Sequence, residues 1–136
     1  MAMQLSVRVR SAIAQAYETD VGASPIIDFY DAVQTPDCAA APAGNLIARG
    51  TLPADWATVS NGVLTKSGTW QATGVLSGGT ARGFRIYRSG SPSECDLQGT
   101  VGPTGSPTYD MGVDNVSVAN GQVITVNTFT VTIGNA

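Results

Sequence analysis

The side chains that could carry chemistry in this sequence are few, and histidine is absent. Histidine is the commonest general base, so neither a serine triad nor a cysteine–histidine pair can be assembled. Lysine occurs once, at Lys66, and no glycine-rich phosphate-binding loop opens a helix. Asp28 and Asp31 point to opposite faces of a regular strand, so they cannot act as a catalytic carboxylate pair. The sequence predicts a protein that is not an enzyme and binds no cofactor.

The oxygen-bearing side chains of Asp110, Asp114 and Asn115 lie close together in the stretch YDMGVDN. Such a group could bind calcium, but it lacks the DxDxDG spacing of a calcium-binding loop. The alternative is that these residues belong to turns and hydrogen-bond to nearby backbone. We favour the turn and predict no metal site.

Two cysteines, Cys38 and Cys95, stand far apart in the sequence. For a chain that stays in a cytoplasm, the default expectation is two reduced, small core residues. Cys95 falls on the inward side of its expected strand, which agrees with that expectation. A Cys38–Cys95 disulfide is the alternative, and a metal site is disfavoured because no histidine is present to complete it.

The composition places the 136-residue chain among single domains large enough to form a core without disulfides or metals. Charged residues make up only 12% of it, about half the usual share. This indicates either a surface largely covered in an oligomer or assembly, or an ordinary β domain rich in hydroxyl groups. The net charge of −3 provides no basic surplus for nucleic acid. No segment is long enough to cross a membrane and no signal-peptide block is seen, so we expect a cytoplasmic product.

Residues 5–20 show the only helical pattern, with apolar side chains at three- and four-residue spacing. Gly22 is a natural C-terminal stop, and Pro25 prevents continuation. The alternative is an arm up to Arg10 followed by a shorter helix. Such a segment either plugs one end of a β domain or docks on a partner, and we favour the plug. The residues of the apolar pattern are Leu5, Val9, Ala12, Ile13, Ala16 and Tyr17.

The rest of the chain shows the alternation of half-buried β-strands. Residues 69–101 form three such runs separated by turns, which predicts an antiparallel meander. Asn61-Gly62 and Asn120-Gly121 are preferred centres of two-residue hairpins. Strands are also expected at 25–33, 45–52 and 109–113, with Ile27, Phe29, Val33, Leu46, Ala48, Leu52, Trp70, Ala72, Leu76, Phe84, Ile86, Leu97 and Val101 inside and Asp28, Tyr30, Arg49, Arg85 and Tyr87 outside.

The last expected strand, residues 122–133, changes its apolar face near Asn127-Thr128. A strand cannot do this without a bulge, a bend or a change of sheet. Eight or nine strands of this kind predict an all-β jelly-roll or Greek-key two-sheet sandwich, with a small open barrel as the alternative. We expect a single domain over residues 1–136, with 1–22 as an N-terminal arm or helix and 25–136 as the sandwich.

Several stretches share an overall pattern with one family. They are VGASP after the helix, PDCAAAPAGNLIARGTLPADW, KSGTWQATG, GFRIYRSG leading to CDLQGTVG, and the ending GQVITVNTFTVTIGNA. The chain resembles the capsid-decoration, or cementing, proteins of tailed bacteriophages, of the type found on a Bordetella phage head. The resemblance implies a jelly-roll subunit, assembled in the host cytoplasm, that lies on the capsid exterior and bridges neighbouring major capsid proteins. It also implies self-association, as a homodimer or alternatively a trimer.

The residues expected to contact the capsid are aromatic and arginine side chains with outward parity, since these types dominate binding energy at interfaces. For each, an ordinary solvated side chain is the alternative, and Trp56 could instead cover the core. A tail or neck component is one alternative function; another is a carbohydrate-binding module with an aromatic platform at Trp56 or Tyr87. The candidates are Arg8, Arg10, Tyr30, Arg49, Trp56, Arg85 and Tyr87, together with the first ten residues as a segment.

Overall fold

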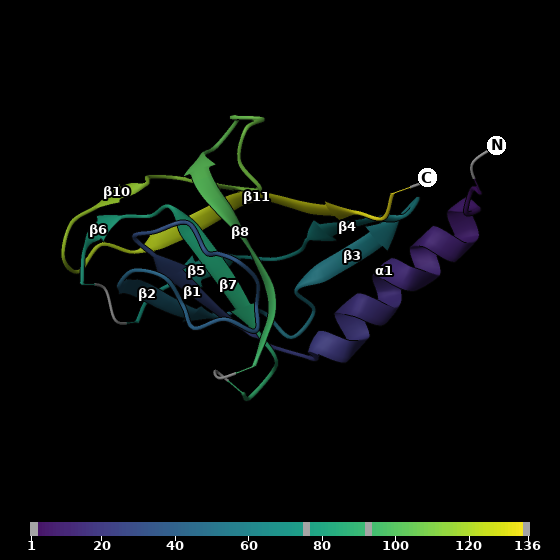
Figure 1. The fold of residues 1–136 in the computed structure, drawn as a ribbon, viewed down its shortest axis with the longest axis horizontal. Helices are drawn as coiled ribbons and strands as arrows, with labels where there is room; N and C mark the ends of the chain where they lie inside the picture. The colour runs from purple at the N-terminus through teal and green to yellow at the C-terminus, as the bar shows by residue number, and fades with distance from the viewer. Residues whose placement is uncertain (1–2, 75–76, 92–93, 135–136) are drawn as a thin grey trace.

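The computed structural model describes residues 3–74, 77–91 and 94–134. One helix lies along the side of a curled β-structure, as Figure 1 shows. The expectation of a mostly β protein with one N-terminal helix is confirmed. Helix α1 spans Val7–Val21, and the strands are β1 (Ile26–Tyr30), β2 (Leu46–Thr51), β3 (Ala57–Ser60), β4 (Val63–Lys66), β5 (Trp70–Ala72), β6 (Gly79–Thr80), β7 (Gly83–Tyr87), β8 (Cys95–Pro103), β9 (Met111–Val113), β10 (Ser117–Val118) and β11 (Ile124–Thr132).

The strands pair into one large curled sheet and one small one. The large sheet has the order β2-β1-β7-β8-β9-β11-β4-β3, with β5 paired separately to β11, and β10 pairs with β6. β8 and β9 run parallel. An isolated bridge joins Arg49 of β2 to Gly74, just beyond β5, with an N–H···O distance of 2.8 Å in each direction. The bridge holds the β2 edge against the chain leaving β5, so the sheet curls around the core.

Helix α1 begins and ends where local groups satisfy its terminal backbone. The Ser6 hydroxyl accepts a hydrogen bond from the N–H of Val9 at 3.2 Å and caps the first turn. At the other end Gly22 has a φ of 92°, and its N–H donates to the carbonyl of Glu18 at 3.2 Å. The expected stop at Gly22 is confirmed. The alternative of an arm up to Arg10 is wrong, because that residue lies within the helix.

The side of α1 that meets the β-structure is not the one expected from its apolar spacing. Ala14 and Val21 are buried, and the Ser11 hydroxyl accepts a hydrogen bond from the N–H of Gly62 at 2.9 Å. Small residues allow this close approach to the β3–β4 turn, and they turn the larger apolar residues outward. Of the residues expected inside, Leu5, Ala12, Ile13 and Ala16 are exposed, and Val9 and Tyr17 are half-buried.

The expected meander is correct in its second and third runs and wrong in its first. β7 and β8 are antiparallel neighbours, but β5 pairs with β11, at the far end of the chain. Alternation identifies a strand without specifying its partner, so the sequence pattern could not exclude this pairing. Leu76, assigned to the first run, lies outside the described residues.

The two Asn-Gly signals have different outcomes. Asn61 and Gly62 have φ values of 52° and 76° and connect the antiparallel strands β3 and β4, so this hairpin is confirmed. Asn120-Gly121 lies in a turn closed by the N–H of Gln122 and the carbonyl of Ala119 at 3.0 Å. The strand before that turn, β10, pairs with β6 instead of β11, so the second hairpin is wrong.

Strand β11 carries the predicted change of face. Its pairing with β9 shifts register between Val126 and Thr128, which confirms the irregularity expected near Asn127-Thr128. On the N-terminal side of the shift β11 pairs with β5, and on the C-terminal side it pairs with β4. One strand thereby joins two parts of the β-structure.

Aromatic side chains fill the centre of the core. Trp70 lies between Trp56 and Phe129, with ring centroids 6.0 Å and 5.4 Å away, and Phe84 packs edge-on against Phe129 at 5.7 Å. The indole N–H of Trp56 donates to the Gly22 carbonyl at 3.0 Å, so Trp56 covers the core beneath the helix end. Within the described residues, no helix is both long and apolar enough to cross a membrane.

Candidate functional site

Four of the seven candidate contact residues are buried in the protein interior. The outward orientation expected for Tyr30, Arg85 and Tyr87 is wrong, because a loop covers that face of the sheet. Trp56 covers the core, which was one of its two expected roles. The exposed fractions are 5% for Tyr30, 1% for Trp56, 2% for Arg85 and 4% for Tyr87, whereas Arg8 is exposed and Arg10 and Arg49 are half-buried.

The buried face of the sheet is organised around Asp28, which is 0% exposed although it was expected outside. It lies directly opposite Arg49 on β2 and Arg85 on β7. Arg49 donates from Nε and Nη2 to the two oxygens of the carboxylate, both at 2.7 Å. This two-point ion pair supplies the partner that a buried carboxylate requires. The Arg49 side chain remains 41% exposed and therefore keeps contact with water.

Two tyrosines extend this polar cluster. The hydroxyl of Tyr30 donates to Asp28 Oδ2 at 3.3 Å and lies 2.8 Å from the hydroxyl of Tyr87. Since Tyr30 has one proton and gives it to the carboxylate, Tyr87 is the donor between the two hydroxyls. Burial, together with the bond to Tyr87, raises the pKa of Tyr30 far above its usual range. The Tyr30 hydroxyl therefore keeps its proton and its hydrogen bond to Asp28.

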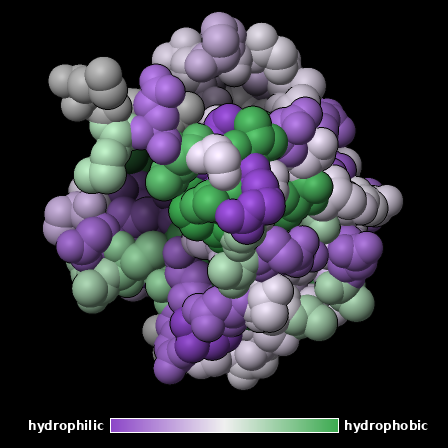
Figure 2. Space-filling model, turned by 90° about the vertical axis from the view of Figure 1, so that its right-hand side faces the viewer, coloured by the Kyte–Doolittle hydropathy of each residue, from purple (hydrophilic) through white to green (hydrophobic). Residues whose placement is uncertain are grey.

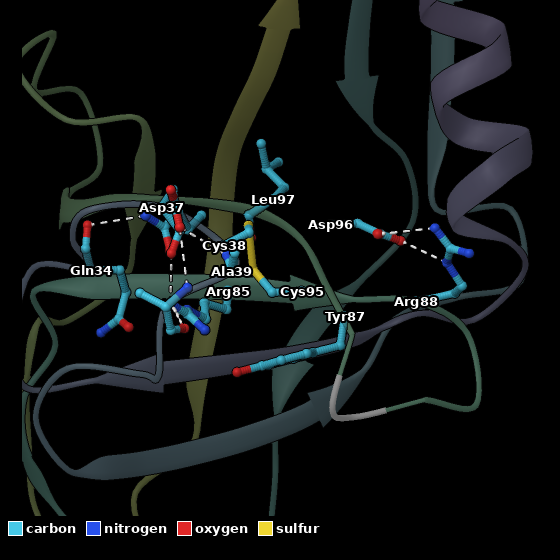
Figure 3. The surroundings of a disulfide bond; sticks show 12 residues. Gln34, Asp37, Cys38, Ala39, Arg85, Tyr87, Arg88, Cys95, Asp96 and Leu97 are labelled. Carbon is cyan, nitrogen blue, oxygen red and sulfur yellow. Dashed lines mark hydrogen bonds and ion pairs between the residues drawn. A yellow bond between two sulfur atoms is a disulfide. The ribbon is translucent and has the colours of Figure 1, made fainter.

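The loop that covers this face, residues 34–44, is tied down by side chains at several points (Figure 3). Arg85 donates from Nη2 to the carbonyls of Asp37 at 3.1 Å and Ala40 at 3.0 Å. The Gln34 amide donates to the Ala43 carbonyl at 2.8 Å and accepts the N–H of Ala43 at 3.0 Å. Arg85 thus replaces, for this loop, the backbone partners that a sheet would supply.

A disulfide between Cys38 and Cys95 fastens the same loop to strand β8 (Figure 3). The two Cα atoms are 5.2 Å apart, within the range that a disulfide spans. The expectation of two reduced cysteines is therefore wrong. That expectation came from the inferred compartment, whereas the pairing follows from the loop folding back across β7 to reach β8.

Beside the disulfide, the loop and β7 enclose a hollow of about 460 Å³, lined by Cys38–Pro42 with Arg85 and Tyr87. Among the described residues that line it there is no free thiol, carboxylate or aliphatic hydroxyl, and the Tyr87 hydroxyl is hydrogen-bonded to Tyr30. Arg85 Nε and Gln98 Oε1 are buried without hydrogen-bond partners, and the two residues are paired across β7 and β8. The residues that line the hollow support a structural role, in which the buried guanidinium of Arg85 holds the loop in place.

The two aspartates considered as calcium ligands instead accept hydrogen bonds from neighbouring groups of the protein. Asp110 Oδ2 accepts from the N–H and the hydroxyl of Thr100 at 2.8 and 3.0 Å. Asp114 Oδ1 accepts from the N–H groups of Asn115 and Thr125 at 2.8 and 3.0 Å. Both patterns are those of residues that fix turns and strand ends. No cluster of three or more metal-ligating side chains occurs in the described part of the chain.

Among the described residues, large apolar side chains are exposed in two separate regions of the surface. One is the outward side of α1 and the segment before it, where Met3 is 90% and Ile13 42% exposed. Figure 2 views the molecule from this side, and hydrophobic residues gather there in the middle around a hydrophilic one. The other region contains Val33, after β1, and Tyr109, before β9, which are 48% and 44% exposed.

No family model, curated protein or solved structure matches the chain. Assignment of a function therefore rests on the residues, their geometry and the pattern of the sequence.

Proposed function

We propose that this protein is a structural virion protein that binds the outer surface of an icosahedral phage capsid and cements neighbouring major capsid proteins. The likeness of its sequence pattern to phage cementing proteins supports the virion role. One structural observation supports adhesion: two separate regions of exposed apolar side chains on one braced β-structure. A bridging protein requires two contact regions held at a fixed separation, and each then raises the effective concentration of the other.

The two regions lie on different parts of the molecule. α1 runs along the right side of Figure 1, and the chain between β8 and β9, which contains Tyr109, projects at the top. Val33 belongs with the second region because the residues around it, Ala32 and Gln34, lie against Gly83, which pairs with Thr100 of β8. We assign this surface beside β8 and β9, defined by Val33 and Tyr109, to the contact with the capsid.

The interior of the β-structure suits a role in load bearing. The covering loop is held by a disulfide and by Arg85, and the sheet edge is closed by the Arg49–Gly74 bridge. Such fastenings raise the cost of local opening, which is the property a reinforcing protein needs. We also propose that the β-structure is a jelly-roll or Greek-key sandwich. The protein would assemble in the host cytoplasm, lie on the capsid exterior and associate with itself as a homodimer.

Of the alternative functions, carbohydrate binding loses its proposed platform. Trp56 and Tyr87 are 1% and 4% exposed, and a sugar-stacking aromatic must present its face to solvent. A tail or neck component remains distinguishable by copy number, because a cementing protein is present in numbers comparable to the major capsid protein.

The experiment titrates purified protein onto capsids assembled from the major capsid protein of the same phage. We expect saturable binding at near-stoichiometric copy number and density on the outer surface by cryo-electron microscopy. Val33→Asp should weaken this binding at least tenfold, whereas Asn120→Asp, which adds the same charge on an exposed turn elsewhere, should not. Binding to tails only, or no binding to either, would overturn the proposal.

A further inference from the structure

Helix α1 presents an apolar stripe to solvent. Pairs of residues three or four apart among Val9, Ala12, Ile13 and Ala16 place these four on one side of the helix. Ala12, Ile13 and Ala16 are exposed, and Val9 is half-buried. Figure 2 shows hydrophobic residues gathered on this side of the molecule.

The stripe is not needed to hold the helix in place. The opposite side of α1 already provides Ala14 and Val21 to the core. There the Ser11 hydroxyl accepts from Gly62 N–H at 2.9 Å, and the Tyr17 hydroxyl donates to the Asp96 carbonyl at 3.1 Å. An amphipathic helix normally buries its apolar stripe, so a helix that docks by its other side leaves the stripe for a second partner.

The charges along α1 run against its own dipole. Arg8 and Arg10 lie in the N-terminal half, Glu18 and Asp20 in the C-terminal half, and the first turn has no acidic and the last turn no basic residue. A helix prefers the reverse order, and each misplaced charge costs about 0.3–1 kcal/mol at low ionic strength. This order is unfavourable in an isolated helix but matches a second copy that runs in the opposite direction.

We infer that α1 pairs antiparallel with α1 of a second copy of this chain, about a twofold axis near Ala12 and Ile13. The antiparallel direction sets the exposed Arg8 of each helix on the side of the exposed Asp20 of the other and aligns the two dipoles favourably. A parallel arrangement would set like charges side by side. The alanines at the centre permit close approach of the two backbones. The same patch serves both partners, as a twofold interface requires.

This pairing rests on the proposed self-association of the capsid-binding protein and names the surface that makes it. Two helices of this length bury less than the roughly 1,200–2,000 Å² of a standard stable interface. The dimer should therefore be weak in free solution. On a shell, two weakly joined subunits bind as one bivalent unit, and the avidity rises without any new contact.

The first test is sedimentation equilibrium of the full-length protein across a range of concentrations. The wild type should show a concentration-dependent monomer–dimer equilibrium. Ile13→Glu should weaken it at least tenfold, because it places charges face to face in an apolar contact. Asn120→Glu, on the turn at the end of the molecule away from α1 in Figure 1, is the matched control and should change nothing. A monomeric wild type, or a dimer that tolerates Ile13→Glu, would overturn the inference.

Charge exchange gives a second test, which separates pairing from helix stability. Arg8→Asp and Asp20→Arg each improve the match to the helix dipole, so each should leave the thermal midpoint unchanged or higher. Each should nevertheless weaken the dimer several-fold at low salt, and the double variant should restore it. Asp20→Arg also removes an ion pair with Arg88, but both of its side chains are exposed, so the pair contributes little. Single variants that leave dimerisation unchanged at low salt would refute the antiparallel arrangement.

Failure of the dimer and failure of the capsid role give different results. If the wild type is monomeric yet still saturates capsids, the proposed function stands and the helix pairing falls. If it dimerises through α1 but binds no capsid, the reverse holds.

Discussion

Removing the Cys38–Cys95 disulfide should destabilise the protein by several kilocalories per mole without unfolding it. The cysteines are 57 residues apart, and the chain-entropy relation for a closed loop of that length gives about 4 kcal/mol at 25 °C. Domains of this size have a total free energy of unfolding of about 5–15 kcal/mol, so the loss is large but tolerable. The covering loop keeps the hydrogen bonds from Arg85 and Gln34, so the native structure should persist in the reduced state.

The measurement is urea unfolding of the Cys38→Ser/Cys95→Ser variant, followed by the fluorescence of the buried Trp56 and Trp70. The wild type in reductant should match the variant, and the variant should be indifferent to reductant. The slope of free energy against urea should rise, because the unfolded chain without its cross-link exposes more surface. A loss below about 1 kcal/mol, or a reductant effect on the variant, would refute the reasoning.

Three further changes have expected outcomes. Asp28→Asn leaves Arg49 without its anion, and because that side chain is 41% exposed the cost in the free energy of unfolding should be about 2–3 kcal/mol, below the range for a fully buried pair; chemical denaturation checks this. Tyr30 has a raised pKa when folded, so it favours the native state fully below the unfolded value of about 10 and progressively less above it. Stability should therefore fall above pH 10, and less steeply in Tyr30→Phe, as thermal scans at pH 8 to 11 would show; equal slopes would contradict the assignment. A Cβ on Gly50 would lie 2.2 Å from the Gln71 carbonyl oxygen, so Gly50→Ala should cost about 3 kcal/mol, whereas Gly134→Ala meets open space and should be neutral in the same assay.

The parts of the fold that sequence could predict are those fixed by neighbours in the chain. Gly22 ends the helix through its own backbone angle, and Asn61-Gly62 makes a turn that needs no distant partner. The change of face at Asn127-Thr128 could also be predicted, because a strand's parity is a local property. Strand partners are not local, so the pairing of β5 with β11 could not be inferred from alternation.

The candidate site failed for a related reason. Alternation correctly placed Tyr30, Arg85 and Tyr87 on the face opposite the core, but it equated that face with solvent. The face is covered by the loop of residues 34–44, which is rich in alanine and proline. The loop has no hydrophobic periodicity from which this covering could be predicted. A signal did exist: Asp28 and Arg49 are single charges inside otherwise apolar strands, IIDFY and LIARGT. Charged side chains are almost never fully buried unless they are paired, and these two isolated opposite charges offered such a pair.

The buried side of helix α1 was predicted wrongly for a different reason. Apolar spacing identifies a stripe on the helix but not what covers it. The β-structure packs against the other side of the helix, which carries Ser11 and Ala14. The hydroxyl of Ser11, which accepts a hydrogen bond from a hairpin turn, carries no signal at the level of hydropathy.

Strand β11 gives the protein a preferred direction of mechanical strength. It is hydrogen-bonded to β5 and β9 over one part of its length and to β4 over the other. A pull along its axis loads these bonds together in shear, so several must break in one event. A pull across the sheet peels them one at a time, at lower force. If the proposed role on a capsid is right, the shell expands under internal pressure in its own plane, and the protein should resist best when this strand lies tangential to the surface. Single-molecule stretching through the end of β11, compared with stretching from an exposed turn, would measure that anisotropy directly.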